Sequence, residues 1–420
     1  MPWNSSLYWK EKYQEGGGTA MEKKRPGKYN SFFMGGFECA DHINRSGQRI
    51  NLLKENQHHL RVEEDYRLLL NLGIKVVREG ICWSEVERAP YHFDFSEVKN
   101  RMSIAEELGI QVIWDLCHFG YPDGIYPTHP LFLERFKLLC REFALFHSKH
   151  SSSTLHVVPI NEISFLSWHS GDVRGTVPFA VNSGFDIKYH LSKAAIEGSK
   201  ILRQVSENCV IYLVEPLVKI HRGDSEISEA ELAELNSHQY QAMDMIAGKM
   251  CPELGGSTEL FDIIGFNYYH SNQWDHEGRT LLWPMETQKL IPLNQLLQTA
   301  YSRYKKPVVL AETGHFGVGR ARWLKEITRE CLTAISAGVD LHGICIYPVI
   351  DRPDWDNLLH YHNSGIFDLD EQKNRIPFPG YVRMIKECVR QGEVEMKEIN
   401  FPTPDAPGLH QKLTAALRKV

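Results

Sequence analysis

Residues 155–162 read LHVVPINE, an apolar run that ends abruptly on an amide and a carboxylic acid. A short apolar run of this kind is typical of a buried strand in a parallel sheet. Similar runs recur along the chain, and longer amphipathic segments separate them, which is the pattern of repeated βα units. The eight expected strands are SFFMGGFE (31–38), IKVVRE (74–79), IQVIWDL (110–116), LHVVPINE (155–162), CVIYLVEP (209–216), DIIGFNYY (262–269), PVVLAET (307–313) and GICIYPV (343–349).

The segments between these strands have helical periodicity. In residues 63–73, Tyr66, Leu69 and Leu70 share one face and Gly73 ends the helix. No G-x-G-x-x-G motif follows the first strand, so a dinucleotide-binding open sheet is disfavoured. A length of 420 residues allows two or three domains, but eight βα units predict a single-domain α/β fold, a (β/α)8 TIM barrel.

Domain boundaries follow from this reading. We expect a flexible leader over residues 1–30, the barrel over 31–392 and a C-terminal extension over 393–420, because GGG and KKRPG lie early in the chain.

Composition excludes several classes of protein. The hydrophobic fraction of 42% is that of a globular chain, and the net charge of −6 without a basic block argues against nucleic acid as a partner. No secretory leader and no run of 18 apolar residues occurs, which predicts a cytoplasmic protein without a membrane partner. The nine cysteines contain no C-x-x-C and several lie in apolar runs, so we expect buried, reduced thiols.

Polar residues crowd the ends of the predicted strands. In a barrel of this type these ends form one face, where active sites lie. Burying such groups without partners costs roughly 2–7 kcal/mol each, so they must bond one another or a polar ligand rich in hydroxyls. The residues at the strand ends are Glu38, Arg78, Glu79, Asp115, His118, Asn161, Glu162, Glu215, Asn267, Tyr268, Tyr269, Glu312, Tyr347 and Asp351.

Two of these carboxylates, Glu162 and Glu312, lie on the fourth and seventh strands, on opposite sides of the ring. A pair of carboxyl groups across a pocket is what cleavage of a glycoside requires, because one donates a proton to the leaving oxygen while the other attacks the sugar carbon. We expect Arg78 and Tyr269 near Glu312, where they keep it ionised, and a raised pKa for Glu162. The predicted partner is therefore a carbohydrate.

The chain resembles a known family at these positions. VVPINE, DIIGFNYY, PVVLAETG and ICIYPVIDRPDWDN resemble motifs of the retaining β-glycosidases of clan A, closest to family 1, the β-glucosidase family. The segments LNLGIKVVREGICWSEVERAPYHFDFSEV and IWDLCHFGYPD resemble its second and third strand regions. The resemblance extends over roughly residues 32 to 390 and implies a hydrolase of O-glycosyl bonds that acts by double displacement.

The resemblance also implies roles for single residues. Glu162 would be the acid/base and Glu312 the nucleophile, and no metal or other cofactor would take part. Around them, His118 and Asn161 would bind sugar hydroxyls, Asn267 and Tyr269 would support the nucleophile, and Trp355 would stack on the sugar. The chain departs from the family at Tyr347-Pro348, where a Trp-Ser is usual, at Asp354, where a Glu is usual, and in AETG, where an Asn usually follows the Glu.

Several alternatives stay open. The same two carboxylates would serve a biosynthetic transglycosidase, and the departures are compatible with a catalytically silent sugar-binding barrel. Glu38, Glu79 and Glu215 are rival carboxylates, of which we expect Glu79 and Glu215 to bond at the rim or to pair with Arg78. His360 and His362 alternate in a way that can ligate zinc, but no thiol or carboxylate lies at a familiar spacing. The sequence leaves the sugar, the aglycone and the oligomeric state undetermined.

Overall fold

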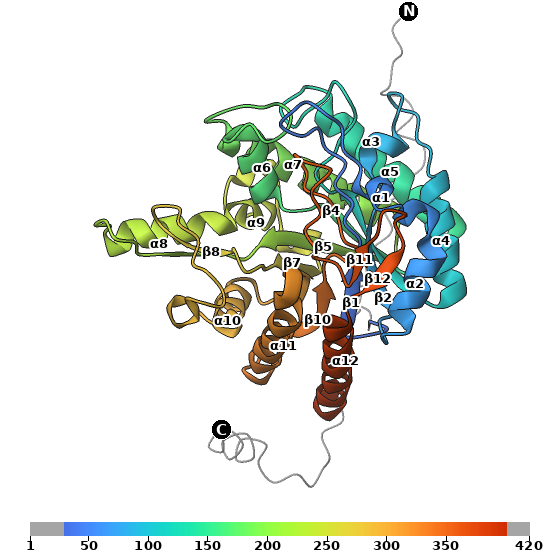
Figure 1. Cartoon of the computed structure of the whole chain (residues 1–420). Helices are drawn as coiled ribbons and strands as arrows, with labels where there is room; N and C mark the ends of the chain where they lie inside the picture. Colours follow the sequence, from blue (N-terminus) through green and yellow to red (C-terminus); the bar gives the residue numbers. More distant parts are fainter. Residues whose placement is uncertain (1–28, 401–420) are drawn as a thin grey trace, which may run out of the picture.

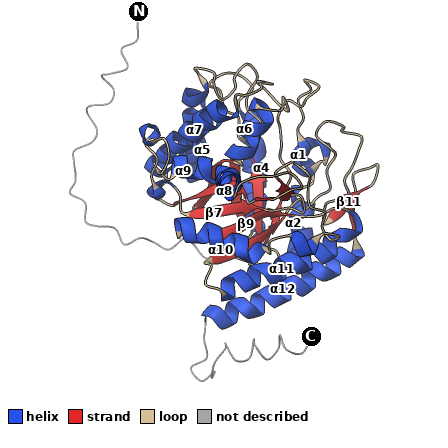
Figure 2. Cartoon of the chain, turned by 90° about the vertical axis from the view of Figure 1, so that its left-hand side faces the viewer, coloured by secondary structure: helices blue, strands red, loops and turns tan. Residues whose placement is uncertain are grey.

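The computed structural model describes residues 29–400, with side chains as far as residue 393. Eight parallel strands close into a barrel in the order β1-β10-β9-β7-β5-β4-β3-β2, and helices enclose them (Figure 2). The predicted single (β/α)8 barrel is therefore confirmed. The barrel strands are β1 (Phe33–Gly36), β2 (Val76–Gly80), β3 (Gln111–Cys117), β4 (Leu155–Ile160), β5 (Cys209–Pro216), β7 (Ile263–Asn267), β9 (Val308–Thr313) and β10 (Leu341–Ile346).

Helices connect successive strands and pack around the outside of the barrel (Figure 1). The predicted helix at 63–73 corresponds to α2, and Gly109 ends α4 in the left-handed conformation that glycine adopts without strain. The helices are α1 (Leu52–Glu55), α2 (Val62–Leu70), α3 (Trp83–Val86), α4 (Ser96–Leu108), α5 (Phe132–His150), α6 (Ile163–Gly171), α7 (Gly184–Val205), α8 (Glu229–Ser237), α9 (Gln241–Ile246), α10 (Leu293–Tyr304), α11 (Arg320–Ser336) and α12 (Pro379–Asn400).

Two short sheets lie outside the barrel. Strands β6 (Lys219–His221) and β8 (Gln273–Asp275) pair in parallel, and β11 (Phe367–Leu369) pairs with β12 (Arg375–Pro377) in antiparallel fashion. The β6–β8 pair lies beside α8, which projects from the body of the molecule at the left of Figure 1. A capping box between Ser228 and Glu231 satisfies the free backbone groups at the start of α8.

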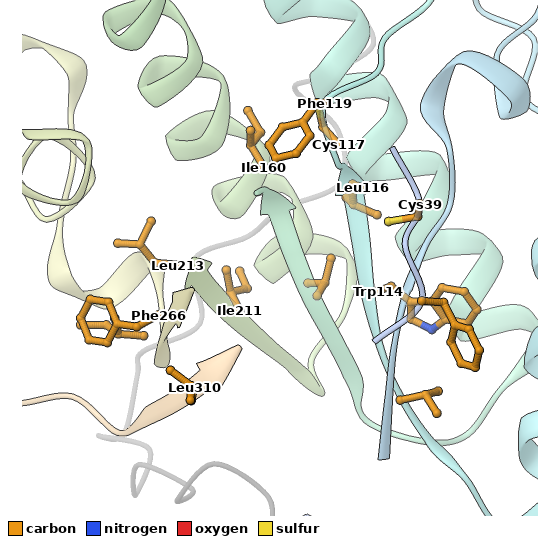
Figure 3. Close-up of a cluster of buried hydrophobic side chains, with 14 of the residues drawn as sticks. Cys39, Trp114, Leu116, Cys117, Phe119, Ile160, Ile211, Leu213, Phe266 and Leu310 are labelled. Atoms are coloured by element: carbon orange, nitrogen blue, oxygen red, sulfur yellow. The ribbon is translucent and has the colours of Figure 1, made fainter. Parts of the chain in front are cut away.

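The apolar core has two layers because successive side chains of a strand point to opposite faces. The inner layer fills the barrel and includes Met34, Ile113 and Val309. The outer layer packs between the strands and the helices, and Figure 3 shows part of it, including Trp114 and Phe266. This packing fixes the strands, and with them the side chains that the strands carry at their carboxyl ends.

Several sequence predictions concern features outside the barrel core. No disulfide joins the nine cysteines; seven are buried as predicted, while Cys209 and Cys251 are partly exposed. Residues 1–28 of the expected leader and 401–420 of the expected extension lie outside the described residues, and residue 393 falls within α12. No helix among residues 29–400 combines the length and apolar character needed to cross a bilayer.

Candidate active site

Glu162 and Glu312 lie at the same end of the barrel. Glu312 is a buried residue near the end of β9, whereas Glu162 follows β4 directly and is half-buried. Glu162 is the N-cap of α6 and has φ 48° and ψ 59°, a left-handed conformation that a non-glycine residue adopts only when its surroundings hold it. The tight turn between strand and helix therefore places the Glu162 side chain at the barrel mouth.

Arg78 connects the two sides of the site. Its Nη1 donates to Oε1 of Glu312 at 2.7 Å, and its Nε and Nη2 hold both oxygens of Asp115 at 3.0 and 2.7 Å. Nη2 also donates to Oδ1 of Asn161 at 2.7 Å. All four side chains are buried, so these charge-assisted bonds replace the water that the charged groups lose. The predicted contact between Arg78 and Glu312 is confirmed.

The two glutamates have opposite electrostatic environments. Glu312 accepts bonds from Arg78 and, at 2.8 Å, from the hydroxyl of Tyr269, and both donors stabilise its charged form. Burial, and then the charge of Glu312, hold the pKa of Glu162 well above its usual value, although a hydrogen bond from Asn267 opposes this. Glu312 thus has two donors that orient its carboxyl group, whereas the protonated form of Glu162 is favoured.

The amide of Asn267 occupies a different place from the expected one. Its Nδ2 donates to Oε1 of Glu162 at 2.9 Å and lies 3.4 Å from Oδ1 of Asn161, so it bonds the predicted acid instead of the predicted nucleophile. The register between β7 and β9 also shifts between Phe266 and Asn267. Tyr269 therefore contacts Glu312 as expected, whereas Asn267 contacts Glu162.

His118 is fixed beside this network. Its Nδ1 donates to Oδ2 of Asp115 at 2.7 Å, and its ring is stacked parallel to that of Tyr347 at 5.9 Å. Burial alone would lower the pKa of His118, but the bond to Asp115 and its charge outweigh burial and raise it. Asp115, which was noted at a strand end but not assigned to the site, is thus its central anion. The spacing Asp115-x-x-His118 is the signal that could have identified it.

Tyr347 fits closely against the first strand. A Cβ added to Gly36 would lie 2.1 Å from Cδ2 of Tyr347, so only glycine leaves room for this ring. The Tyr347 hydroxyl donates to the carbonyl oxygen of Phe37 at 3.3 Å. Tyr347 therefore lies in the wall of the site beside His118.

Trp355 lies further out, in an aromatic cluster. Its ring meets those of His42, Phe119 and Phe165 edge-on, with centroids 4.8, 5.5 and 6.0 Å away. His42, which sequence reasoning left out of the site, is buried, and neither of its ring nitrogens has a hydrogen-bond partner among the described residues. Burial, and then His169, lower its pKa to about 3, so His42 is a neutral imidazole. Its position after the first strand was the available signal.

Asp354 is engaged within its own loop. Its Oδ1 accepts from the backbone nitrogens of Asp356 and Asn357 at 2.8 and 3.0 Å, and its Oδ2 lies 3.4 Å from His362. The side chain therefore stabilises the loop that carries Trp355.

The rival carboxylates have other partners. Glu79 bonds His58, Tyr66 and Arg101, so the expected rim bond or pairing with Arg78 is wrong. Glu38 accepts from the backbone of Ala40 and lies 3.3 Å from Arg352. Glu215 accepts from the backbone of Ser164 and does not pair with Arg78 either. Of the carboxylates considered, Glu162 and Glu312 are the pair that fits the predicted roles. Both lie at the barrel mouth, Glu312 is bonded by Arg78 and Tyr269, and the pKa of Glu162 is raised.

Cys39, Asp115 and His118 bring metal-capable atoms within 4.8 Å of one another, and they form the single group of this kind among the described residues. The set fits a metal poorly. Both oxygens of Asp115 already pair with Arg78, and burial, followed by the charge of Asp115, raises the pKa of the Cys39 thiol well above its usual value.

The fold is similar to that of known enzymes. No family model matches the sequence. Among solved structures, a family 1 β-glucosidase from Thermotoga maritima is 16% identical with a TM-score of 0.66, covering 80% of this chain and 87% of that chain. A β-glucosidase from the same organism in complex with glucoimidazole is 16% identical with a TM-score of 0.70, covering 86% of this chain and 98% of that chain. At this identity the likeness shows the shared barrel.

Proposed function

We propose that this chain is a glycosidase that hydrolyses a β-linked O-glycoside with retention of configuration. One observation carries the proposal: two carboxyl groups share the barrel mouth, one bonded by Arg78 and Tyr269, the other held above its usual pKa. That combination is the one that a double displacement needs. The β-glucosidase names of the structural neighbours support the same class of reaction.

In the first step, Oε2 or Oε1 of Glu312 attacks the anomeric carbon and forms a glycosyl ester. Glu162 gives its proton to the glycosidic oxygen as the bond from carbon to oxygen breaks, so the aglycone leaves as a neutral alcohol. Arg78 and Tyr269 orient Glu312 for this attack. Asn267 holds the carboxyl group of Glu162 through its bond to Oε1.

In the second step, Glu162 is an anion and accepts a proton from a water molecule, whose oxygen attacks the same carbon from the face that the aglycone left. The ester bond to Glu312 breaks, and the sugar is released with its original configuration. No further cofactor enters either step.

The remaining site residues would bind the sugar. Asp115 bonds His118, and Arg78 bonds Asn161. Beside the two glutamates, His118 and Asn161 would bond ring hydroxyls of the sugar. Tyr347 and Trp355 would cover the apolar face of the ring, and Asp354 would act through the loop that carries Trp355.

The test uses an aryl β-glycoside with a good leaving group. Glu312→Ala should lower kcat at least about 10⁴-fold, and azide should restore turnover and give the glycosyl azide of inverted configuration, which NMR of the product identifies. Full activity of the folded variant would remove Glu312 from the mechanism. A wild-type chain that hydrolyses no glycoside and forms no covalent adduct with a 2-fluoroglycoside would instead be a silent barrel.

A further inference from the structure

Four large apolar side chains are exposed on two loops at the mouth of the barrel. Leu282 and Met285, 51% and 68% exposed, lie between β8 and α10, and Phe316 and Val318, 51% and 88% exposed, lie between β9 and α11. We call these four residues the rim patch. The first loop is part of the connection that leaves the carboxyl end of barrel strand β7, and the second follows barrel strand β9, so both belong to the same face of the molecule as Glu312.

The two loops form one surface. Trp283, which lies between Leu282 and Met285, is buried and packs against His315 with ring centroids 4.9 Å apart. His315 in turn is stacked on its neighbour Phe316 at 4.6 Å. A contiguous exposed apolar surface is uncommon on a soluble fold unless something binds it.

Rings connect the rim patch to the candidate nucleophile. The hydroxyl of Tyr269 donates to Glu312, and the next residue, His270, lies 4.4 Å from His315 and 5.2 Å from Phe316 between centroids. Two adjacent residues, Tyr269 and His270, therefore connect Glu312 to the loop that carries Phe316.

The two histidines beside the rim patch are uncharged near neutral pH. Burial, and then His315, lower the pKa of His270 to about 4, and burial lowers the pKa of His315. The charged groups around these loops have partners: Arg322 lies over the Trp283 ring at 5.5 Å, and Glu326 accepts from its Nε1 at 3.1 Å. Glu286 pairs with Arg279 and Lys289 at 3.2 and 2.8 Å.

We propose that the rim patch binds the leaving group of the substrate and that this group is an uncharged apolar chain or ring system. The inference rests on the proposed function, in which the aglycone leaves from the mouth and the sugar occupies the polar floor. An apolar aglycone would cover side chains that otherwise face water, and each methylene that becomes buried would improve binding by up to about fourfold.

The test compares methyl, butyl, hexyl and octyl β-glycosides of whichever sugar the wild type hydrolyses fastest, all below their micelle concentrations. We expect kcat/KM to rise about two- to fourfold per methylene for the wild type, mainly through KM. Phe316→Ser combined with Val318→Ser should flatten the series, so that the ratio of kcat/KM for the octyl and methyl glycosides falls toward one. Leu145→Ser, at a 43% exposed position on α5, is the matched control and should keep the slope.

The outcomes separate this inference from the proposed function. A flat series for an active wild type overturns the role of the rim patch alone. A slope that survives the double substitution, or a substitution that changes only the oligomeric state, also overturns it. Calorimetric titration of Glu312→Gln with octyl and methyl glycosides gives a reading without turnover, and equal affinities for both would contradict the inference.

A second, independent observation concerns Glu215. This residue of β5 is fully buried, and its two carboxylate oxygens accept from the backbone nitrogen of Ser164 at 3.3 and 3.1 Å. Ser164 lies in the first turn of α6, where free backbone N–H groups need acceptors, and the N-cap of the same helix is Glu162 in its left-handed conformation. Glu215 thus bonds the first turn of the helix whose N-cap is the predicted acid.

We infer that Glu215 is a positioning residue for Glu162, because its carboxyl group holds the turn that presents Glu162. The inference rests on the assignment of Glu162 as the acid. Among the charged groups that face Glu162, Glu312 and Glu215 raise its pKa and Arg78 lowers it. Burial raises the pKa of Glu215 itself to about 7, while the bonds from Ser164 and the charge of Lys188 on α7 oppose this.

Glu215→Gln keeps the size and an acceptor oxygen but removes the charge. We expect the alkaline limb of the kcat/KM profile to move to lower pH by about half a unit to one unit. Carbon-13 NMR titration of Glu162 should show the same fall without any need for turnover. Glu87→Gln, at a buried carboxylate paired with Arg135, is the control and should leave the limb in place. Reduced activity at every pH with an unmoved limb and an unmoved Glu162 titration would reduce Glu215 to a structural part and overturn the inference.

Discussion

Nη1 of Arg78 lies 2.7 Å from Oε1 of Glu312, and the same guanidinium holds both oxygens of Asp115. Arg78 comes from β2 and Glu312 from β9, so one cation fixes carboxylates from distant parts of the chain. A planar group with a fixed fork of donors is suited to this, because it bonds several acceptors at once without reorganisation.

Replacing Arg78 by lysine should therefore be severe. An ammonium group keeps the charge but cannot bond Asp115 through two atoms and reach Glu312 and Asn161 together. We expect Arg78→Lys to lose about 2–4 kcal/mol of unfolding free energy and about a hundredfold in kcat, measured by urea unfolding and with an aryl glycoside. Arg67→Lys, at an exposed ion pair with Glu63, should change both quantities little. Equal behaviour of the two variants would contradict this account.

Removing the amide of Asn267 should shift the pH profile upward. Its bond to Oε1 of Glu162 favours the ionised form of that acid, so without it the pKa of Glu162 rises further. For Asn267→Ala we expect the alkaline limb of kcat/KM to move to higher pH by about half a unit or more, opposite to the shift for Glu215→Gln. A limb that moves to lower pH in the folded variant would reject this reading, and Asn374→Ala, in an exposed loop, serves as the unaffected control.

Much of this arrangement follows from the sequence. Parallel strands of a barrel end on one face, so residues that follow apolar runs, such as Glu162 and Glu312, are predicted to meet although 150 positions separate them. Strand alternation carries more information than we used. Because Arg78 points into the barrel, the next residue, Glu79, must point outward, where it meets His58 and Arg101.

Other features could not be predicted from local patterns. Asn267 contacts Glu162, and the register between β7 and β9 shifts beside it; no spacing in the sequence signals either feature. Asp354 bonds the backbone of its own loop, and loop shape depends on many weak contacts instead of on a repeating pattern. The sequence shows that Asp115 lies at the end of a strand, but only the structure shows that it bonds both Arg78 and His118.

The close contact between Gly36 and Tyr347 predicts that a larger residue at position 36 disturbs the site. A methyl group on Gly36 would lie 2.1 Å from the Tyr347 ring, so the ring or the strand must move. We expect Gly36→Ala to cost about 1–3 kcal/mol of stability and to raise KM, because Tyr347 flanks His118 in the site. In Gly380→Ala the nearest atom is 3.8 Å from the new carbon, so stability and KM should stay unchanged. Wild-type KM in Gly36→Ala would show that the position of Tyr347 does not matter for binding.

A buried ion network outside the site should make stability depend on pH. His58 is buried between Oδ2 of Asp65 and Oε1 of Glu79, with each of its ring nitrogens 2.8 Å from one carboxylate. Burial opposes the charged imidazole, but Glu79 and Asp65 outweigh burial and raise the pKa of His58 above 6.5. A group whose pKa is higher in the folded state stabilises the fold fully below its unfolded pKa, and this stabilisation is lost as the pH rises through the folded pKa.

We therefore expect His58→Gln to lower the free energy of unfolding by about 2–4 kcal/mol at pH 6, because Glu79 and Asp65 lose the cation between them and keep only Arg101 and Arg375. The difference from the wild type should shrink as the pH rises from 6.5 through the higher pKa of the folded state, because the unfolded imidazole releases its proton first. Urea unfolding of both proteins at intervals from pH 6 to pH 9 measures this difference directly and cancels the contribution of every other histidine. His92→Gln, on the exposed surface, should follow the wild-type curve at each pH. A difference between His58→Gln and the wild type that stays constant or grows with pH would mean that His58 is neutral in the fold and acts only through packing against Phe37.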